Sequence, residues 1–177
     1  MIEKLKRIFN KYFSTPETTP IVKRDDCISF HVAGISFHDD EVNKLIKVLL
    51  KDGAIEKYDG MTNSEIKEYG DSVSIYENQY IGGVKLEGYE YKGKDAIRVL
   101  VKDTQDQYYD VGNVPEEYIE RFSDLLTDET IEFTNAEYEI VGGKTKYIEY
   151  DDDDKPELVE DELNYGICIL IYYKKKD

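Results

Sequence analysis

Residues 30–37 have the sequence FHVAGISF, in which apolar side chains recur on both sides of a single glycine. Apolar and polar residues alternate in its first half, which is typical of a half-buried β-strand. A glycine inside such a run marks a bend or a close approach of two backbones. We therefore expect one long strand over 28–37 with a kink at Gly34. Phe37 is expected either to pack in the core or to stack on a ligand.

Similar apolar alternations follow through the middle of the chain, separated by Gly, Asn and Asp. They lie at residues 73–75, 80–86, 96–101 and 108–111. Short strands bounded by turn residues are typical of antiparallel sheets. The composition agrees with this, because 16 tyrosines and no tryptophan accompany many β-branched residues.

The C-terminal part predicts a hairpin and a final strand. Strand-like residues 131–150 are interrupted by Gly142 and Gly143, a pair that suits a tight hairpin turn. The acidic residues 151–162 indicate a polar loop, and residues 165–173 a last strand. The four aspartates at 151–154 do not supply the spaced ligands and turn glycine of a calcium loop, so we expect no metal there.

Three segments of this region predict helices. Apolar residues at 42, 45, 46, 49 and 50 share one helical face over 40–51. The sequence TNSE at 62–65 is a capping box that predicts a helix over 63–69. Pro115 suits a first helical position and precedes an apolar stripe that ends in a leucine pair. Strands with flanking helices indicate the α+β class.

The N-terminus is expected to be an appendage. Residues 2–13 have apolar side chains at helical spacing, with lysines and an arginine beside them, and predict a short amphipathic helix. Residues 14–20 contain two prolines and indicate a linker. We expect residues 1–20 to stand apart from one domain over 21–177. The helix could dock on that domain or serve a partner; it is too short and too weakly basic to favour membrane attachment.

The charge of the chain is strongly acidic and unevenly placed. There are 39 acidic against 23 basic side chains, for a formal net charge of −16. Such a field repels phosphate and argues against non-specific coating of duplex DNA. Residues 1–24, however, hold six basic and two acidic side chains, whereas residues 116–164 hold four basic and 18 acidic ones. A local basic surface and a separate acidic one are both compatible with this distribution.

The sequence lacks the motifs of common enzyme classes. It contains no GxxxxGK(S/T), no GxGxxG after a strand, no HExxH and no GxSxG. His31 and His38 are the only histidines, and an unbroken strand would send them to opposite faces. We therefore expect a binding module that is not an enzyme and has neither metal nor cofactor.

The two cysteines and the hydropathy indicate a compartment. Cys27 and Cys168 form no CxxC spacing and lie in predicted strands, so two buried thiols are expected. No apolar stretch matches a signal peptide or a membrane span. We expect a cytoplasmic protein without a membrane partner.

Three motifs, taken in order, resemble the HIRAN domain. The family patterns are roughly V-x-G-(V/I)-x-(F/Y) in an opening strand, N-P-x-D-x-x-A-I-x-V at the entry to a central strand, and V-G-(Y/H/N)-(V/L)-P before a helix that ends in two leucines. The matching residues are Val32, Gly34, Ile35, Phe37, Asp95, Ala96, Ile97, Val99, Val111, Gly112, Val114, Pro115, Leu125 and Leu126. The resemblance covers about residues 28–173. It implies a small modified OB-like antiparallel β-barrel with flanking helices, found fused to helicases and nucleases or alone in bacteria and phages.

The resemblance also implies contact positions for a ligand, which in the best-understood members is a single-stranded 3′ DNA end. OB-type surfaces stack bases on aromatic rings and follow phosphates with cations. The sequence departs from the family in three places. Ser36 replaces an arginine, Gly93 replaces an acid, and residues 90–93, EYKG, replace the N-P-Y-D entry. The candidate nucleic-acid contacts are Ser36, Phe37, Tyr91, Lys92, Lys94 and Asn113.

Two functions from different classes remain open at this point. The first is a module for single-stranded DNA or DNA ends. The second is an acidic protein-interaction module or inhibitor that docks on a basic, nucleic-acid-handling partner. The candidate contacts also have a plain structural interpretation, in which Tyr91, Lys92 and Lys94 form a solvated hairpin edge and Asn113 only shapes its turn.

Overall fold

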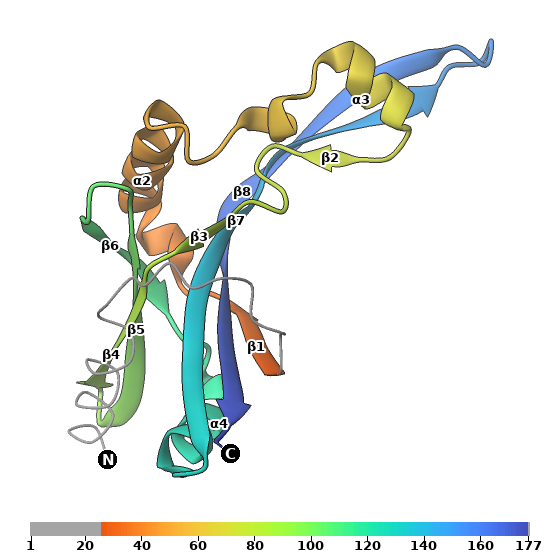
Figure 1. Ribbon diagram of the computed structural model, residues 1–177. Helices are drawn as coiled ribbons and strands as arrows, with labels where there is room; N and C mark the ends of the chain where they lie inside the picture. The colour runs from red at the N-terminus through yellow and green to blue at the C-terminus, as the bar shows by residue number, and fades with distance from the viewer. Residues whose placement is uncertain (1–25, 177) are drawn as a thin grey trace.

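The computed structural model describes residues 26–176, so the predicted helix and linker of residues 1–20 lie outside the described part. Helices and strands alternate irregularly along the chain (Figure 1). In order, the elements are β1 (Asp26–His31), the 3-10 helix η1 (Ile35–Phe37), α2 (Asp39–Lys51), the 3-10 helix η2 (Lys57–Gly60), α3 (Asn63–Tyr69), β2 (Val73–Ser74), β3 (Tyr80–Gly82), β4 (Val84–Tyr91), β5 (Lys94–Lys102), β6 (Tyr108–Asn113), α4 (Glu116–Thr127), β7 (Ile131–Tyr150) and β8 (Pro156–Lys175).

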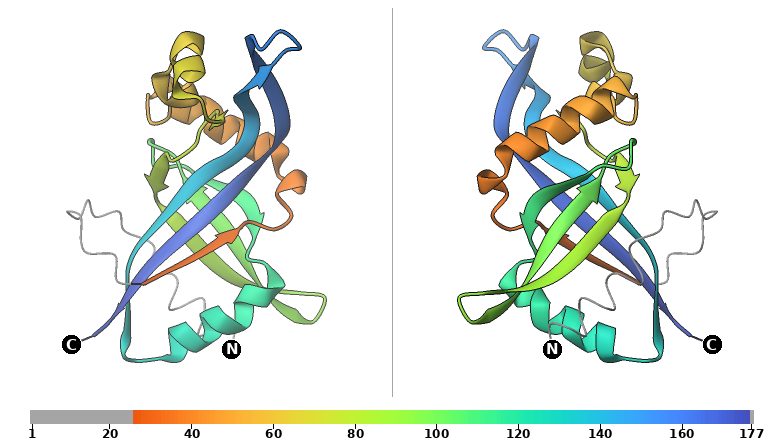
Figure 2. Two further views of the ribbon diagram at one scale, coloured as in Figure 1. Left: turned by 90° about the vertical axis from the view of Figure 1, so that its right-hand side faces the viewer. Right: turned by 90° about the vertical axis from the view of Figure 1, so that its left-hand side faces the viewer.

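The strands form two antiparallel sheets, which confirms the α+β class. One sheet has the order β1-β8-β7-β2, with β3 also paired to β7, and the other has the order β4-β5-β6. The strands of the two sheets cross each other, with α4 lying across one end of the crossing (Figure 2). No closed barrel is found among residues 26–176. The sheets are nevertheless linked twice, by an isolated bridge between Ala33 and Asn113 and by Gly83, which joins β3 directly to β4.

Apolar side chains from both sheets and from the helices form one core. Leu45 and Leu49 of α2 are fully buried, as the helical spacing predicts. Phe122 of α4 is also buried, and its ring meets that of Phe30 edge-on at 5.6 Å. Burying a side chain of this size stabilises the fold by about 1.5–3 kcal/mol. The contact fixes α4 against β1 and so fixes the end of β6 that leads into α4.

The three predicted helices are confirmed with small shifts of their ends. In α3 the capping box is complete, because Thr62 Oγ1 accepts from the Glu65 N–H and Glu65 Oε2 accepts from the Thr62 N–H at 2.7 Å. Pro115 is the residue before α4 and not its first helical residue. No helix among the described residues is long and apolar enough to cross a membrane.

The predicted long strand over 28–37 is wrong beyond its first residues. Strand β1 ends at His31, and Gly34 adopts a left-handed backbone with φ of 76°. From there the chain turns into η1, closed by the Phe37 N–H donating to the Gly34 carbonyl at 3.0 Å. A left-handed residue cannot continue a strand, and glycine adopts this conformation without steric cost. The turn carries Phe37 out of the sheet, and its side chain is 90% exposed.

The predicted hairpin turn at Gly142 and Gly143 is also wrong. Both glycines have positive φ, but they form a bulge inside β7, which continues to Tyr150. A Cβ at Gly142 would lie 2.3 Å from the Asn164 carbonyl oxygen, so only glycine fits. The actual turn is at residues 151–155, and most of the predicted acidic loop belongs to β8. Residues 144–163 thus form an arm of paired β7 and β8, which β2 joins at residues 145 and 146 and whose tip projects beyond the rest of the sheet (Figure 1).

The prediction of two buried thiols is wrong as well. Cys27 is exposed and Cys168 is half-buried. Cys27 belongs to β1 and lies opposite Tyr172, and Cys168 belongs to β8 and lies opposite His31. Their neighbours Ile28 and Ile169 are buried, so the alternation of the strands turns the cysteines to the outer face of the sheet.

Candidate functional site

One face of the β4-β5-β6 sheet packs on the core and the other is turned to solvent. In β4, Val84 and Leu86 are buried, while Lys85, Glu87 and Tyr89 alternate with them and are only partly buried. The antiparallel register continues the solvent side across β5 and β6. We call this surface the open face; it comprises Lys85, Glu87, Tyr89, Tyr91, Lys94, Ala96, Arg98, Leu100, Tyr108, Asp110 and Asn113.

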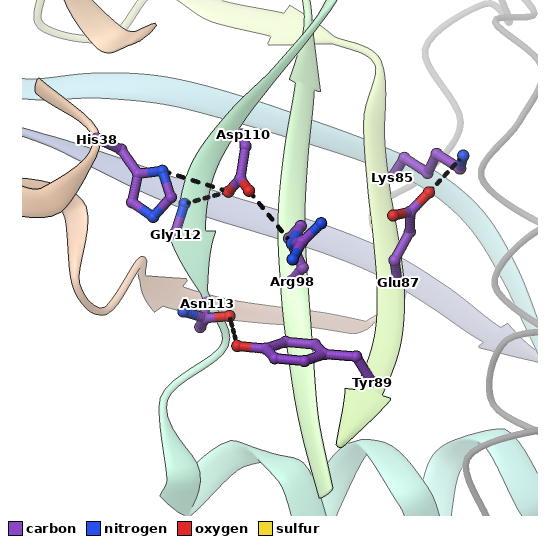
Figure 3. A network of polar contacts seen from close by, with 8 residues as sticks. All are labelled: His38, Lys85, Glu87, Tyr89, Arg98, Asp110, Gly112 and Asn113. Atoms are coloured by element: carbon purple, nitrogen blue, oxygen red, sulfur yellow. Dashed lines mark hydrogen bonds and ion pairs between the residues drawn. The ribbon is translucent and has the colours of Figure 1, made fainter. Parts of the chain in front are cut away.

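A tyrosine, an arginine and an asparagine are joined at the centre of the open face. The Tyr89 hydroxyl donates to Asn113 Oδ1 at 2.7 Å, although the two residues lie on the outer strands of the sheet (Figure 3). The guanidinium carbon of Arg98, on the strand between them, is 5.2 Å from the centroid of the Tyr89 ring. Asn113 is held in turn by two backbone hydrogen bonds with Ala33, of 2.8 and 2.9 Å. These contacts fix an aromatic ring and a cation next to each other.

Asp110 connects the centre of the open face to α2. Its Oδ2 lies 3.2 Å from Arg98 Nε, and its Oδ1 lies 3.5 Å from His38 Nδ1. The Gly112 N–H donates to the same Oδ1 at 3.2 Å (Figure 3). A bulge between Val99 and Leu100 places Asp110 opposite Leu100, so that it can reach across to Arg98. The Arg98 side chain keeps 45% of its surface exposed and remains accessible to a ligand.

Two further tyrosines of the open face have a cation beside the ring. Lys92 Nζ lies 5.0 Å from the centroid of Tyr91, and Lys85 Nζ lies 5.9 Å from the centroid of Tyr108. A cation over an exposed ring is worth about 0.5–1 kcal/mol. Together with the pair of Arg98 and Tyr89, the open face thus presents three rings, each accompanied by a positive charge.

Carboxylates balance part of this charge. Glu87 Oε1 lies 2.7 Å from Lys85 Nζ, just as Asp110 pairs with Arg98. Partly exposed pairs of this kind contribute at most about 1 kcal/mol and exchange readily with other ions. An anionic ligand can therefore displace either carboxylate from its cation.

The sequence-predicted contacts lie around this network. Ser36 and Phe37 are exposed on η1, next to β6, so the alternative that Phe37 belongs to the core is wrong. Tyr91 is 56% exposed at the end of β4, and Lys92 begins the turn into β5 with φ of 51°. Asn113 does more than shape a turn, because it accepts the Tyr89 hydrogen bond.

Lys94 is paired with a carboxylate of α4. Its Nζ lies 2.9 Å from Glu116 Oε1 at the start of α4. The hydrogen bond and the charge of Glu116 raise the pKa of Lys94, and the same contact lowers the pKa of Glu116. In the β4-β5 pairing Lys94 lies directly opposite Tyr91, so it belongs to the open face, with its ammonium group held by Glu116.

Sequence reasoning missed Tyr89, Arg98, Asp110 and His38. The sequence does indicate that Arg98 faces solvent, because it lies between the apolar residues Ile97 and Val99, which are both buried in the core. A charged residue between two core positions of a strand must face solvent. No local signal joins His38 to Asp110, since the contact depends on how α2 packs against β6.

Comparison with protein-family models, curated proteins and solved structures found no match to this chain. The resemblance to the HIRAN domain stays a prediction that depends on the motifs quoted above.

Proposed function

We propose that the chain is a non-catalytic module that binds single-stranded nucleic acid on its open face. The observation that carries this proposal is the Arg98 guanidinium held over the Tyr89 ring, whose hydroxyl donates a hydrogen bond to Asn113. Proteins bind single strands by stacking bases on aromatic or guanidinium planes and by pairing phosphates with cations. The open face offers both groups within one residue pair.

The proposal includes a HIRAN-type, OB-like architecture. Two observations support it. The bridge between Ala33 and Asn113 and the direct passage from β3 to β4 link the two sheets at opposite corners, as a distorted barrel requires. Phe37 and Asn113, which the family resemblance marks as contacts, belong to η1 and to the last position of β6, two elements that contact each other.

The net charge of −16 is compatible with this function because the charge is segregated. The arm carries nine acidic and three basic side chains, and it extends from the β7-β8 pair, away from β4 and β5 (Figure 1). On the open face, by contrast, Lys85 and Arg98 balance Glu87 and Asp110. We expect binding that is moderate at low salt and weakens as salt is added.

The direct test is fluorescence anisotropy with a dye-labelled single strand of about 16 nucleotides. Affinity should fall linearly with salt on logarithmic axes between about 50 and 200 mM. Replacing Arg98 with Gln should weaken binding. It should also lower the magnitude of the salt slope by about 1, which corresponds to the loss of one phosphate contact. Lys44→Gln is the matched control, because Lys44 is also an exposed, ion-paired cation but lies on α2. Absence of binding by the unaltered protein at low salt would defeat the proposal.

The arm supports a second candidate function, docking on a basic surface of a nucleic-acid-handling protein. Its turn holds four consecutive aspartates, of which Asp151 accepts backbone hydrogen bonds from Asp153 and Lys155. The arm thus presents an ordered acidic tip at the end of a protruding ribbon, which favours electrostatic steering toward a cationic partner. Replacing residues 151–154 with asparagine should weaken binding to poly-lysine, whereas unchanged affinity would count against this function.

A further inference from the structure

The three pairs of a tyrosine and a cation lie in a row along β4. Tyr91 and Lys92 are at the hairpin end, Tyr89 and Arg98 come next, and Lys85 with Tyr108 is at the opposite end. Residues 85 and 91 are both on β4, six positions apart, which corresponds to about 20 Å along a strand. The surface is therefore long in one direction and carries three chemically similar pairs of a tyrosine and a cation. We call each pair a station.

Each station has the two groups that one nucleotide can use. A tyrosine ring can stack on a base, and the adjacent cation can pair with the phosphate that joins it to its neighbour. A site for a strand end needs a single station that encloses the terminal sugar. A row of stations needs no end, because every internal nucleotide offers the same base and the same phosphate.

We infer that the open face binds an internal tract of single-stranded nucleic acid that runs along β4, and does not require a strand end. The inference rests on the proposed function and specifies the part of the ligand that is recognised. The strand crosses the centre of the sheet at Tyr89 and Arg98 and reaches Lys85 and Tyr108 at the far end.

The acidic side chains on the row tune this binding. Glu87 lies between Lys85 and Tyr89 on β4 and holds Lys85 at 2.7 Å. A phosphate that approaches Lys85 must displace Glu87, so this station contributes less than a free cation would. The Arg98 station is better prepared, because Asp110 contacts Nε and the side chain is 45% exposed.

A covalently closed circle of single-stranded DNA tests the inference, because it has no ends. The circle and a linear strand of the same sequence compete with a dye-labelled linear strand for the full-length protein. We expect equal affinities within about twofold, since every contact is internal. A linear strand that competes and a circle that does not would overturn the inference and leave the proposed function standing. If neither strand competes, both fail.

A variant at the far end of the row gives an independent test. Lys85→Gln should weaken binding of the circle by about threefold and lower the magnitude of its salt slope by about 0.7. Lys44→Gln should leave both unchanged. Both variants alter lysines outside the core, Lys85 being partly buried and Lys44 exposed. A Lys85→Gln protein that binds the circle as tightly as the unaltered protein would show that the tract does not extend to this end.

Discussion

The Tyr89 hydroxyl donates a 2.7 Å hydrogen bond to Asn113 Oδ1 across the whole width of the three-stranded sheet. The bond passes over β5 and places the Tyr89 ring beside Arg98 (Figure 3). Asn113 is also the residue that bridges the two sheets through Ala33. A single asparagine therefore couples the architecture of the domain to the position of its central aromatic ring.

Replacing Tyr89 with Ala should weaken binding of single-stranded DNA about 5- to 150-fold, because one stacked base contributes about 1–3 kcal/mol. Tyr89→Phe keeps the ring and loses only the hydroxyl, so its effect should be much smaller. Tyr69 on α3 is 62% exposed and provides the control for removal of a surface tyrosine. Fluorescence anisotropy measures all three variants. An equal loss in the Phe and Ala variants would mean that stacking is not the role of the ring.

Replacing Glu87 with Gln should tighten binding of the same strand by about two- to fivefold at low salt. The change removes a negative charge from the path of the phosphates and releases Lys85 from its 2.7 Å ion pair. The Glu41→Gln variant, which releases Lys44 on α2, is the matched control and should change nothing. Weaker binding by the Glu87 variant would contradict a phosphate path over this residue.

Replacing Gly112 with Ala should lower the free energy of unfolding by about 2–3 kcal/mol. Gly112 has φ of 131°, and a Cβ there would lie 2.4 Å from the Ala33 carbonyl oxygen, at the bridge between the sheets. Gly53→Ala is the control, since Gly53 also has positive φ but no atom within 4 Å of its Cβ position. That variant should lose only about 1 kcal/mol. Urea denaturation gives both values, and equal losses would show that the close approach to Ala33 is not present.

Replacing Thr62 with Val should raise the pKa of Glu65 toward its ordinary value of 4.5. Hydrogen bonds from the Thr62 backbone N–H and hydroxyl hold this pKa below that value. A carboxylate with a lowered pKa stabilises the fold above its ordinary pKa, and this contribution is lost as pH falls through the lowered value. Titration of Glu65 by NMR measures the shift, and an unchanged pKa would show that the Thr62 hydroxyl does not hydrogen-bond to Glu65 in solution.

Local patterns in the sequence predicted the helices well. The spacing of Val42, Leu45 and Leu49 and the capping box at Thr62 depend on neighbours within a few residues, and the structure confirms α2 and α3. The prediction for Gly142 and Gly143 was wrong because a glycine pair suits both a hairpin turn and a bulge. The glycines form a bulge because β7 continues past them and pairs with β8, where Gly143 lies opposite Leu163.

The candidate site was predictable only in part. The family resemblance marked Phe37 and Asn113, and both lie near the open face. Arg98 could have been found from strand alternation, since Ile97 and Val99 on either side of it are buried, whereas only Gly88 is buried beside Tyr89. The contact of His38 with Asp110 could not, because it joins a helix start to a strand that follows it by many residues.

The most direct test of the central claim is a titration of the isotope-labelled protein with oligothymidine, followed by NMR chemical shifts. Binding on the open face predicts the largest shifts at Tyr89, Arg98 and Asn113, with smaller ones at Lys85 and Tyr91 and none in residues 144–163. Shifts confined to the arm, or no shifts at low salt, would contradict the claim that this sheet binds single-stranded nucleic acid.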